Sequence, residues 1–104
     1  MFLITKLYNE SDMLTIIKNI KNDKYINIIE TEHFLTRTDR KYCSYRLTYN
    51  LLKTQYPLRI EYQEFNKFKL FYPHPDSNKY NLILIIFIES IDEIRILTTF
   101  PEEI

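Results

Sequence analysis

The sequence predicts an α+β domain in which helices pack on one face of a mostly antiparallel sheet of four to five strands. Two patterns support this prediction: apolar residues recur at helical spacing in much of the first half, and they alternate with polar residues in the second half. The length of 104 residues, with 45% hydrophobic and 27% charged residues, is typical of one globular domain. We therefore expect a single two-layer domain, 1–104, with one core.

The N-terminal part predicts a strand followed by a helix. Residues 2–8 are mostly apolar and predict a short strand, and the polar residues 9–12 supply a cap for the helix that follows. The apolar stripe of this helix consists of Leu14, Ile16, Ile17 and Ile20. We expect the helix to end near residues 22–23.

A strand and a longer helical region come next. Residues 25–29 are β-branched and aromatic and predict a strand. Residues 32–53 show helical spacing, so we expect one bent helix or two helices broken near residues 36–39, with Cys43 in the helical core stripe. Pro57 stops this region, because the residue before a proline avoids helical backbone angles.

After Pro57 the apolar period falls to two, which predicts antiparallel strands. Residues 58–63 and 67–70 alternate in this way, with a turn at Asn66 between them. Residues 73–78 are dense in turn formers and predict the loop of a second hairpin.

Two further strands complete the predicted sheet. Residues 81–89 have an unbroken apolar middle, so we expect a central strand covered on both faces. Residues 93–100 predict the last strand, with Ile94 and Ile96 facing one way, Arg95 and Leu97 the other, and Pro101 ending it.

The composition excludes several function classes. The chain has no Gly, and Gly-rich phosphate loops, dinucleotide fingerprints and nucleophile elbows all require it. One cysteine cannot form an intramolecular disulfide, and His33 and His74 stand far apart in the sequence, so we expect no metal and no cofactor. The absence of Ala and Val beside abundant Ile, Asn and Lys indicates an AT-rich coding sequence from a microbe or a virus.

The apolar runs predict a cytoplasmic protein. The N-terminal run is too short for a signal peptide and lacks a small-residue cleavage site. The longest run, residues 82–88, is far below the roughly 20 residues that cross a bilayer. We therefore expect no contact with a membrane.

The overall balance of 14 basic and 14 acidic residues hides a strong asymmetry. Residues 33–59 hold six Lys and Arg against one Asp, whereas residues 89–104 hold five acidic residues against one Arg. A basic helical face is the usual footprint of a nucleic-acid backbone, which makes RNA a candidate partner. The alternative is a solvated helix whose cations pair with the acidic C-terminal segment.

Aromatic residues interleave with these cations. Tyr42, Tyr45 and Tyr49 offer surfaces on which bases stack. The alternative, which we favour, is that these tyrosines and Leu52 form an apolar helical stripe packed on the sheet. The candidate nucleic-acid-binding residues are Lys41, Arg46, Lys67 and Lys69.

The sharpest candidate catalytic group is His33 with Arg37 and Arg40. At i, i+4 and i+7 on a helix these side chains share one face, which suits general acid or base catalysis beside a phosphate. Arg95 is the fourth candidate catalytic residue, because the last strand is able to bring it to the same face. The alternative is that His33 only caps or packs at the start of its helix.

Residues 29–40, Ile-Glu-Thr-Glu-His-Phe-Leu-Thr-Arg-Thr-Asp-Arg, resemble the opening helix of a family of small prokaryotic domains with a T-x-H-hydrophobic-x-x-R-x-x-x-R pattern. That family is similar in layout to the RelE-like and BrnT-like toxins, and residues 94–101 resemble its closing strand. The resemblance spans about residues 25–101. It implies a RelE-like fold and a metal-independent endoribonuclease that cleaves mRNA and is neutralised by an antitoxin protein.

By position, His33, Arg37, Arg40 and Arg95 match the polar residues of the family's patterns. The chain departs from them in three ways: its two helical arginines are three residues apart instead of four, residues 82–88 hold no Arg, and the C-terminal Arg and Tyr of RelE-type enzymes are missing. Two alternatives to an enzyme therefore stay open. One is a non-catalytic nucleic-acid-binding or protein-interaction module of viral or plasmid origin, and the other is a homodimer formed through an exposed sheet edge.

Overall fold

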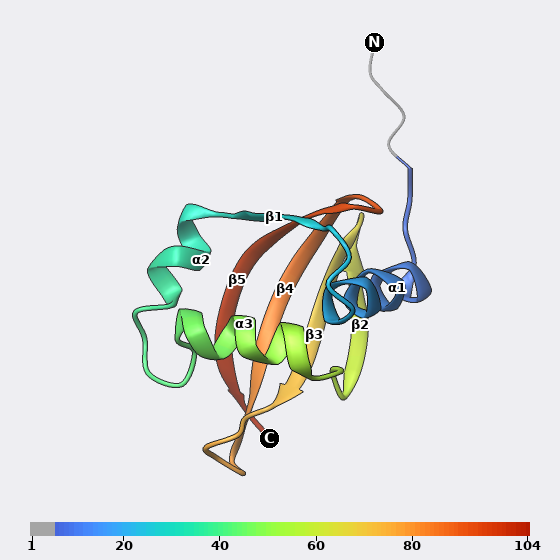
Figure 1. Cartoon of the computed structure of the whole chain (residues 1–104). Coiled ribbons are helices and arrows are strands. Elements are labelled where there is room, and N and C mark those ends of the chain that lie inside the picture. Colours follow the sequence, from blue (N-terminus) through green and yellow to red (C-terminus); the bar gives the residue numbers. More distant parts are fainter. Residues whose placement is uncertain (1–5) are drawn as a thin grey trace.

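Five strands form one mixed sheet in the order β1-β5-β4-β3-β2, accompanied by three helices (Figure 1). The computed structural model describes residues 6–104. The elements in chain order are α1 (Glu10–Lys21), β1 (Asn27–Glu30), α2 (Glu32–Arg37), α3 (Tyr45–Thr54), β2 (Arg59–Glu64), β3 (Lys67–Pro73), β4 (Tyr80–Ser90) and β5 (Glu93–Glu103). The α+β class is confirmed.

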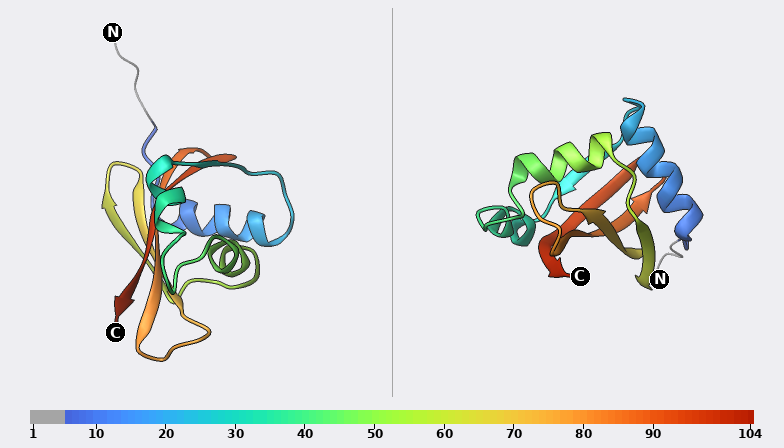
Figure 2. Two further views of the ribbon diagram at one scale, coloured as in Figure 1. Left: turned by 90° about the vertical axis from the view of Figure 1, so that its left-hand side faces the viewer. Right: turned by 90° about the horizontal axis from the view of Figure 1, so that it is seen from below.

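The helices do not all take the same position. Figure 2 shows α1 and α3 on one side of the sheet, whereas α2 lies at the sheet's edge beside β5. The expectation of a mostly antiparallel sheet holds for β2 to β5, but β1 pairs with β5 in parallel. The core lies between the sheet and the two covering helices, where side chains of α1 and α3 pack on those of β3, β4 and β5.

Helix α1 forms close to where its capping residues predict it. The side chain of Asn9 accepts the backbone N–H of Asp12, and the Asp12 carboxylate accepts the N–H of Asn9, so a capping box starts the helix. Its buried residues are Met13, Ile16, Ile17 and Ile20, whereas Leu14 is 46% exposed. Three of the four residues of the expected stripe therefore enter the core.

The helical region 32–53 is two helices separated by residues 38–44. The break occurs because Ser44 starts a new helix: its hydroxyl accepts the N–H of Leu47. The break thus extends further than residues 36–39. Cys43 is buried as expected but lies in the turn instead of on a helix, where its Sγ donates to the Arg37 carbonyl at 3.2 Å.

Thr31 connects the start of α2 to β5. Its hydroxyl accepts the N–H of Phe34 at 3.1 Å and lies 2.9 Å from the carbonyl oxygens of Ile96 and Leu97, to which it donates. The same side chain therefore caps α2 and donates to backbone carbonyl groups of β5.

We expect Thr31→Ala to lower the free energy of unfolding by about 1–2 kcal/mol, because a cap and a strand contact are lost together. Urea denaturation measures this effect. Thr15→Ala is the matched control, since the hydroxyl of Thr15 donates only within α1, to Ser11. Equal losses in the two variants would show that the link between α2 and β5 adds nothing.

The predicted turn at Asn66 is confirmed. Asn66 has a φ of 59°, a left-handed angle that Asn tolerates well, and it joins β2 to β3. Its buried side chain accepts the N–H of Tyr8 at 2.7 Å and donates to the Lys6 carbonyl at 2.8 Å.

Of the strand predicted for residues 2–8, residues 2–5 lie outside the described residues, and residues 6–8 form no strand.

β4 is the middle strand of the sheet, as predicted, but its cover differs between the two faces. The helices cover only one face; on the other face Ile85 and Phe87 are half-buried, whereas Ile83 is fully buried. We call that other surface the far face. The expectation of cover on both faces is therefore confirmed only in part: no described helix packs on the far face, but side chains of neighbouring strands bury Ile83 there.

Pro101 does not end β5, which continues to Glu103. The N–H of Ile104 donates to the Lys79 carbonyl of the hairpin at 2.9 Å, and backbone direction alternates along a strand. The nitrogen of Pro101 therefore faces away from β4. A proline at this position therefore removes no backbone hydrogen bond between β4 and β5, which is why the strand tolerates it.

Both sheet edges carry features that bear on the predicted homodimer. At β2 the N–H of Tyr62 donates to the Glu10 carboxylate at 3.4 Å, and a bulge follows before Glu64. At β5 the outward nitrogen of Pro101 has no hydrogen to offer a neighbouring strand. The homodimer stays a prediction, which a measurement of mass in solution tests.

No helix in the described part of the chain is long and apolar enough to cross a membrane.

Candidate nucleic-acid interface

His33 and Arg37 lie side by side, one turn apart on α2. The Nε–H of Arg37 donates to Nε2 of His33 at 3.4 Å, so that ring nitrogen carries no proton in this arrangement. His33 is exposed, and the cap of α2 is Thr31. The histidine therefore neither caps its helix nor packs into the core, and its imidazole is accessible to a ligand.

Arg40 and Arg95 lie in different surroundings. α2 ends at Arg37, so Arg40 sits in the turn that follows instead of on the next helical turn. Arg95 lies on β5 between two core residues and donates its Nε–H to Glu89 at 2.6 Å. Strand alternation directs it to the far face. Within residues 6–104, no hydrogen bond or ion pair joins Arg95 to any of the other three candidates.

The cations between α2 and the end of α3 have no carboxylate partners. Four ion pairs occur in the described part of the chain, and all four belong to the sheet or its turns. The cations without such a pair in this segment are Arg37, Arg40, Lys41, Arg46 and Lys53. We call the surface made by α2, residues 38–44 and α3 the α2–α3 surface.

The acidic C-terminal segment pairs elsewhere. Glu102 binds Lys69 at 2.7 Å and Glu89 binds Arg95 at 2.6 Å. The alternative in which this segment neutralises the helical cations is therefore wrong. Within the described residues the cations of the α2–α3 surface form no ion pair, which leaves them open to a phosphate backbone.

The tyrosines on this surface are less buried than we expected. Tyr45 is 44% exposed and Tyr42 36% exposed, so neither belongs to a core stripe. Tyr42 precedes α3, and α3 turns Thr48, Leu51 and Leu52 toward the sheet instead. Tyr49 packs against the core edge, and Leu52 is buried as predicted.

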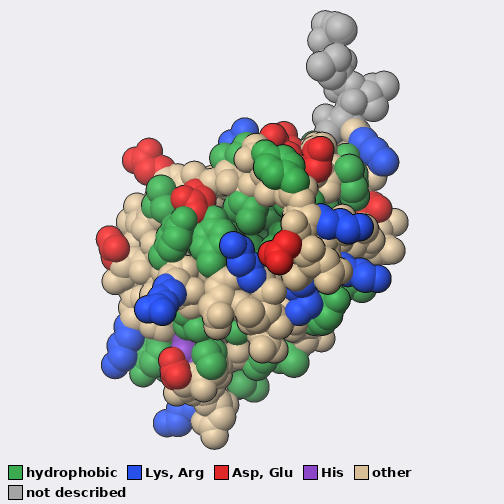
Figure 3. Space-filling model, viewed as in Figure 1, with side chains coloured by type: hydrophobic (Ala, Val, Ile, Leu, Met, Phe, Trp, Pro, Cys, Tyr) green, Lys and Arg blue, Asp and Glu red, His purple; other side chains and the backbone are tan. Residues whose placement is uncertain are grey.

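A carboxylate holds two of these tyrosines together. Glu30 at the end of β1 accepts hydrogen bonds from the hydroxyls of Tyr45 and, at 2.5 Å, of Tyr49. The two rings are 4.8 Å apart, and that of Tyr45 lies 6.1 Å from Phe34. Figure 3 shows hydrophobic side chains at the surface between β1 and α3, with Lys and Arg side chains below them. Aromatic and basic groups therefore lie near one another here.

The contacts of Glu30 keep both hydroxyls protonated. Burial and then the hydrogen bond to Glu30 raise the pKa of Tyr49 far above its ordinary value. For Tyr45 the hydrogen bond to Glu30 is the main cause of a raised pKa. Both side chains therefore act as hydrogen-bond donors at neutral pH.

We expect the free energy of unfolding to fall as the pH rises above about 10, where tyrosines of the unfolded chain ionise. The raised pKa values stabilise the fold below that pH, and this contribution is lost as the pH climbs toward the folded-state values. Denaturant titrations from about pH 9 to 11 measure the slope. A Tyr45→Phe/Tyr49→Phe variant should show a shallower slope, whereas Tyr25→Phe, at a 78% exposed position, should match the parent. Equal slopes in all three proteins would contradict the role of Glu30.

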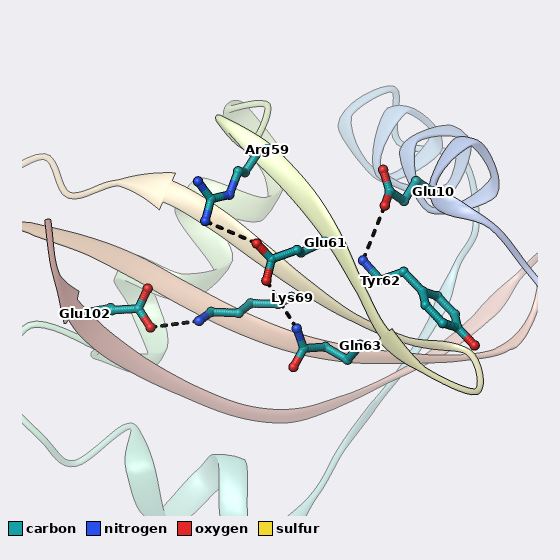
Figure 4. Close-up of polar contacts among 7 residues, drawn as sticks. All are labelled: Glu10, Arg59, Glu61, Tyr62, Gln63, Lys69 and Glu102. Carbon is teal, nitrogen blue, oxygen red and sulfur yellow. Dashed lines mark hydrogen bonds and ion pairs between the residues drawn. The ribbon is translucent and has the colours of Figure 1, made fainter.

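Lys67 and Lys69 lie on the far face, away from the other candidate nucleic-acid ligands. Figure 4 shows Lys69 bound to Glu102 and Arg59 bound to Glu61 on this face. Lys67 binds Glu64 at 3.4 Å. The structure thus separates the two strand lysines from Lys41 and Arg46 and engages them in ion pairs.

Glu30 is the residue of this surface that sequence reasoning missed. The spacing of Tyr45 and Tyr49 by four places their hydroxyls together, but nothing local shows which acceptor they meet. Glu30 reaches them because β1 runs beside β5 and α3 crosses the sheet next to it. Only the tertiary arrangement of β1 and α3 shows that Glu30 is the acceptor.

Cys43 offers no reactive group to this surface. Its side chain is fully buried, and burial raises the pKa of the thiol although the charges of Arg37 and Arg40 act in the opposite direction. Within residues 6–104, no three His, Cys, Asp or Glu side chains gather as metal ligands do.

Comparisons with protein-family models, with curated proteins and with solved structures returned no match.

Proposed function

We propose that this protein binds single-stranded RNA through the α2–α3 surface. The observation that carries the proposal is the set of five cations on this surface without carboxylate partners. On the far face, by contrast, an RNA phosphate would have to displace Glu64, Glu102 or Glu61 from its cation. Binding of a phosphate is therefore more favourable on the α2–α3 surface than on the far face.

The aromatic groups favour single strands. Exposed tyrosine rings stack on unpaired bases, which a duplex keeps inside its own stack. Tyr45 is 44% exposed, and Glu30 fixes its hydroxyl. Cations and aromatic rings on one surface offer contacts to both the phosphates and the bases of a strand.

Titration of a fluorescent single-stranded RNA of mixed sequence in EDTA tests this function. If all five cations engage phosphates, the affinity should fall about 100-fold between 50 and 200 mM salt, since each contact adds about 0.7 to the logarithmic slope. An absence of binding at about 50 mM salt, or binding that salt does not affect, would overturn the proposal.

A second candidate function is metal-independent cleavage of RNA, as the sequence resemblance to the RelE-like and BrnT-like toxins implies. The contact between His33 and Arg37 favours it, because it places a neutral imidazole nitrogen beside a guanidinium. His33 would accept the proton of a 2′-hydroxyl, whose oxygen attacks phosphorus. The bond to the 5′ oxygen then breaks, and that oxygen takes a proton from water.

The roles of the arginines follow from their places. Arg37 and Arg40 would neutralise the phosphate, while Arg95 must first leave Glu89 to join them. An antitoxin would be an acidic protein that covers the α2–α3 surface.

Incubation of labelled RNA with the parent, His33→Ala and Arg37→Ala in EDTA tests whether the protein is an enzyme. Cleavage lost in both variants supports it, and binding without cleavage by the parent contradicts it.

A further inference from the structure

Tyr42 has a backbone conformation that a bulky residue rarely adopts. Its φ is 69°, in the left-handed region, and the surrounding residues must hold it there. His74 supplies one restraint. Its Nδ1 accepts the N–H of Asp76 at 3.1 Å, so Nε2 carries the proton and donates to the Tyr42 carbonyl at 3.0 Å. His74 is 7% exposed, so water competes little for this bond.

The restraint places the ring of Tyr42 against Tyr80 at the wall of a groove. The two rings are stacked with centroids 5.6 Å apart, and the ring of His74 meets Tyr42 edge-on at 5.4 Å. The groove has a volume of about 900 Å³ and lies at the loop between β3 and β4. That size falls in the range of small-molecule sites.

The groove also holds polar groups with free hydrogen-bonding capacity. Asn78 lines it, and within the described residues its side-chain amide makes no hydrogen bond. An amide offers one acceptor and two donors, the groups that a nucleobase edge pairs with. Arg40 and Lys41 directly precede Tyr42, and the Lys41 ammonium lies over the Tyr42 ring, 5.0 Å from its centroid, so a cation of the α2–α3 surface reaches the groove.

We infer that this groove binds one unpaired nucleobase of the RNA. The base would stack on the ring of Tyr80, which Tyr42 backs, while the Asn78 amide hydrogen-bonds its edge. His74 acts as a positioning residue, because it holds the backbone of Tyr42. This inference rests on the proposed RNA binding and adds to it a site that selects among bases.

Nucleosides test the groove independently of charge, because they carry no phosphate. We expect at least one of adenosine, guanosine, cytidine and uridine, added to the ¹⁵N-labelled protein, to shift the amide resonances of Tyr42, Asn78 and Tyr80 in NMR spectra. The resonances of α3 should stay in place. An absence of shifts at the groove with all four nucleosides would overturn the inference, even if RNA binds elsewhere.

Substitution of Tyr80 provides the second test. Tyr80→Leu removes the stacked ring and should weaken RNA binding about tenfold at an unchanged salt slope. Tyr80→Phe keeps the ring and should bind like the parent, which separates stacking from the hydroxyl. RNA affinity of Tyr80→Leu equal to that of the parent would overturn the base site. If the parent binds no RNA, the proposed function fails, and the nucleoside shifts alone decide whether the groove accepts a base.

Discussion

Replacing Arg37, Arg40 and Arg46 together with glutamine should lower the affinity for single-stranded RNA about 100-fold at 0.1 M salt. The three cations have no carboxylate partners, so each is free to displace a counterion from a phosphate. Each lost contact also reduces the logarithmic salt slope by about 0.7, so the variant's slope should be smaller by about 2. Fluorescence anisotropy at several salt concentrations measures both quantities.

The matched control removes three cations from the far face. Arg59, Lys67 and Lys69 are each bound to a carboxylate, so their replacement with glutamine should leave RNA affinity and salt slope unchanged. The two triple variants have the same net charge. If the control loses as much affinity as the helical variant, binding follows overall charge and the α2–α3 surface has no special part in it.

Ile86→Ala should lower the free energy of unfolding by about 2–5 kcal/mol. Ile86 is fully buried in the middle strand, paired in register with Phe68 on one side and Ile96 on the other. Truncation leaves a cavity that helices and strands cannot close. Because small domains are stable by only about 5–15 kcal/mol, we expect the melting temperature to fall by about 10 °C or more.

Ile85→Ala is the control for this substitution. Ile85 is the neighbouring residue on the same strand, but it faces the far face between Lys69 and Thr98 and is half-buried. Its truncation should cost about 1 kcal/mol or less. Urea denaturation compares the two variants. Equal losses would contradict the partial exposure of Ile85 and indicate that something packs on this part of the far face in solution.

The elements that depend on local chemistry could be predicted from the sequence. The capping residues before α1, the Asn66 turn and the period-two strands all follow from residues close together in the chain, and the structure contains each of them. The contact between His33 and Arg37 is of this kind too, since a spacing of four on a helix brings side chains together.

Features that depend on distant pairing could not be predicted. Nothing near β1 shows that it adds to β5 in parallel, and the tolerance of β5 for Pro101 depends on which way its nitrogen points relative to β4. The acceptor role of Glu30 follows from that same parallel pairing.

Two of the four candidate catalytic residues, Arg40 and Arg95, do not lie where the sequence suggested. Arg40 was expected on the same helical face as His33, but α2 ends at Arg37 because Ser44 begins a separate helix. Arg95 was expected nearby, but strand alternation directs it to the far face, where Glu89 binds it. Spacing alone therefore located two of the four residues together.

The central claim is that RNA binds the α2–α3 surface, and mapping by NMR tests it most directly. A short single-stranded RNA is added to the ¹⁵N-labelled protein at low salt, and the amide shifts are assigned. We predict that the largest shifts fall within residues 33–53. Shifts confined to β2 and β3, or no shifts at all, would contradict the claim.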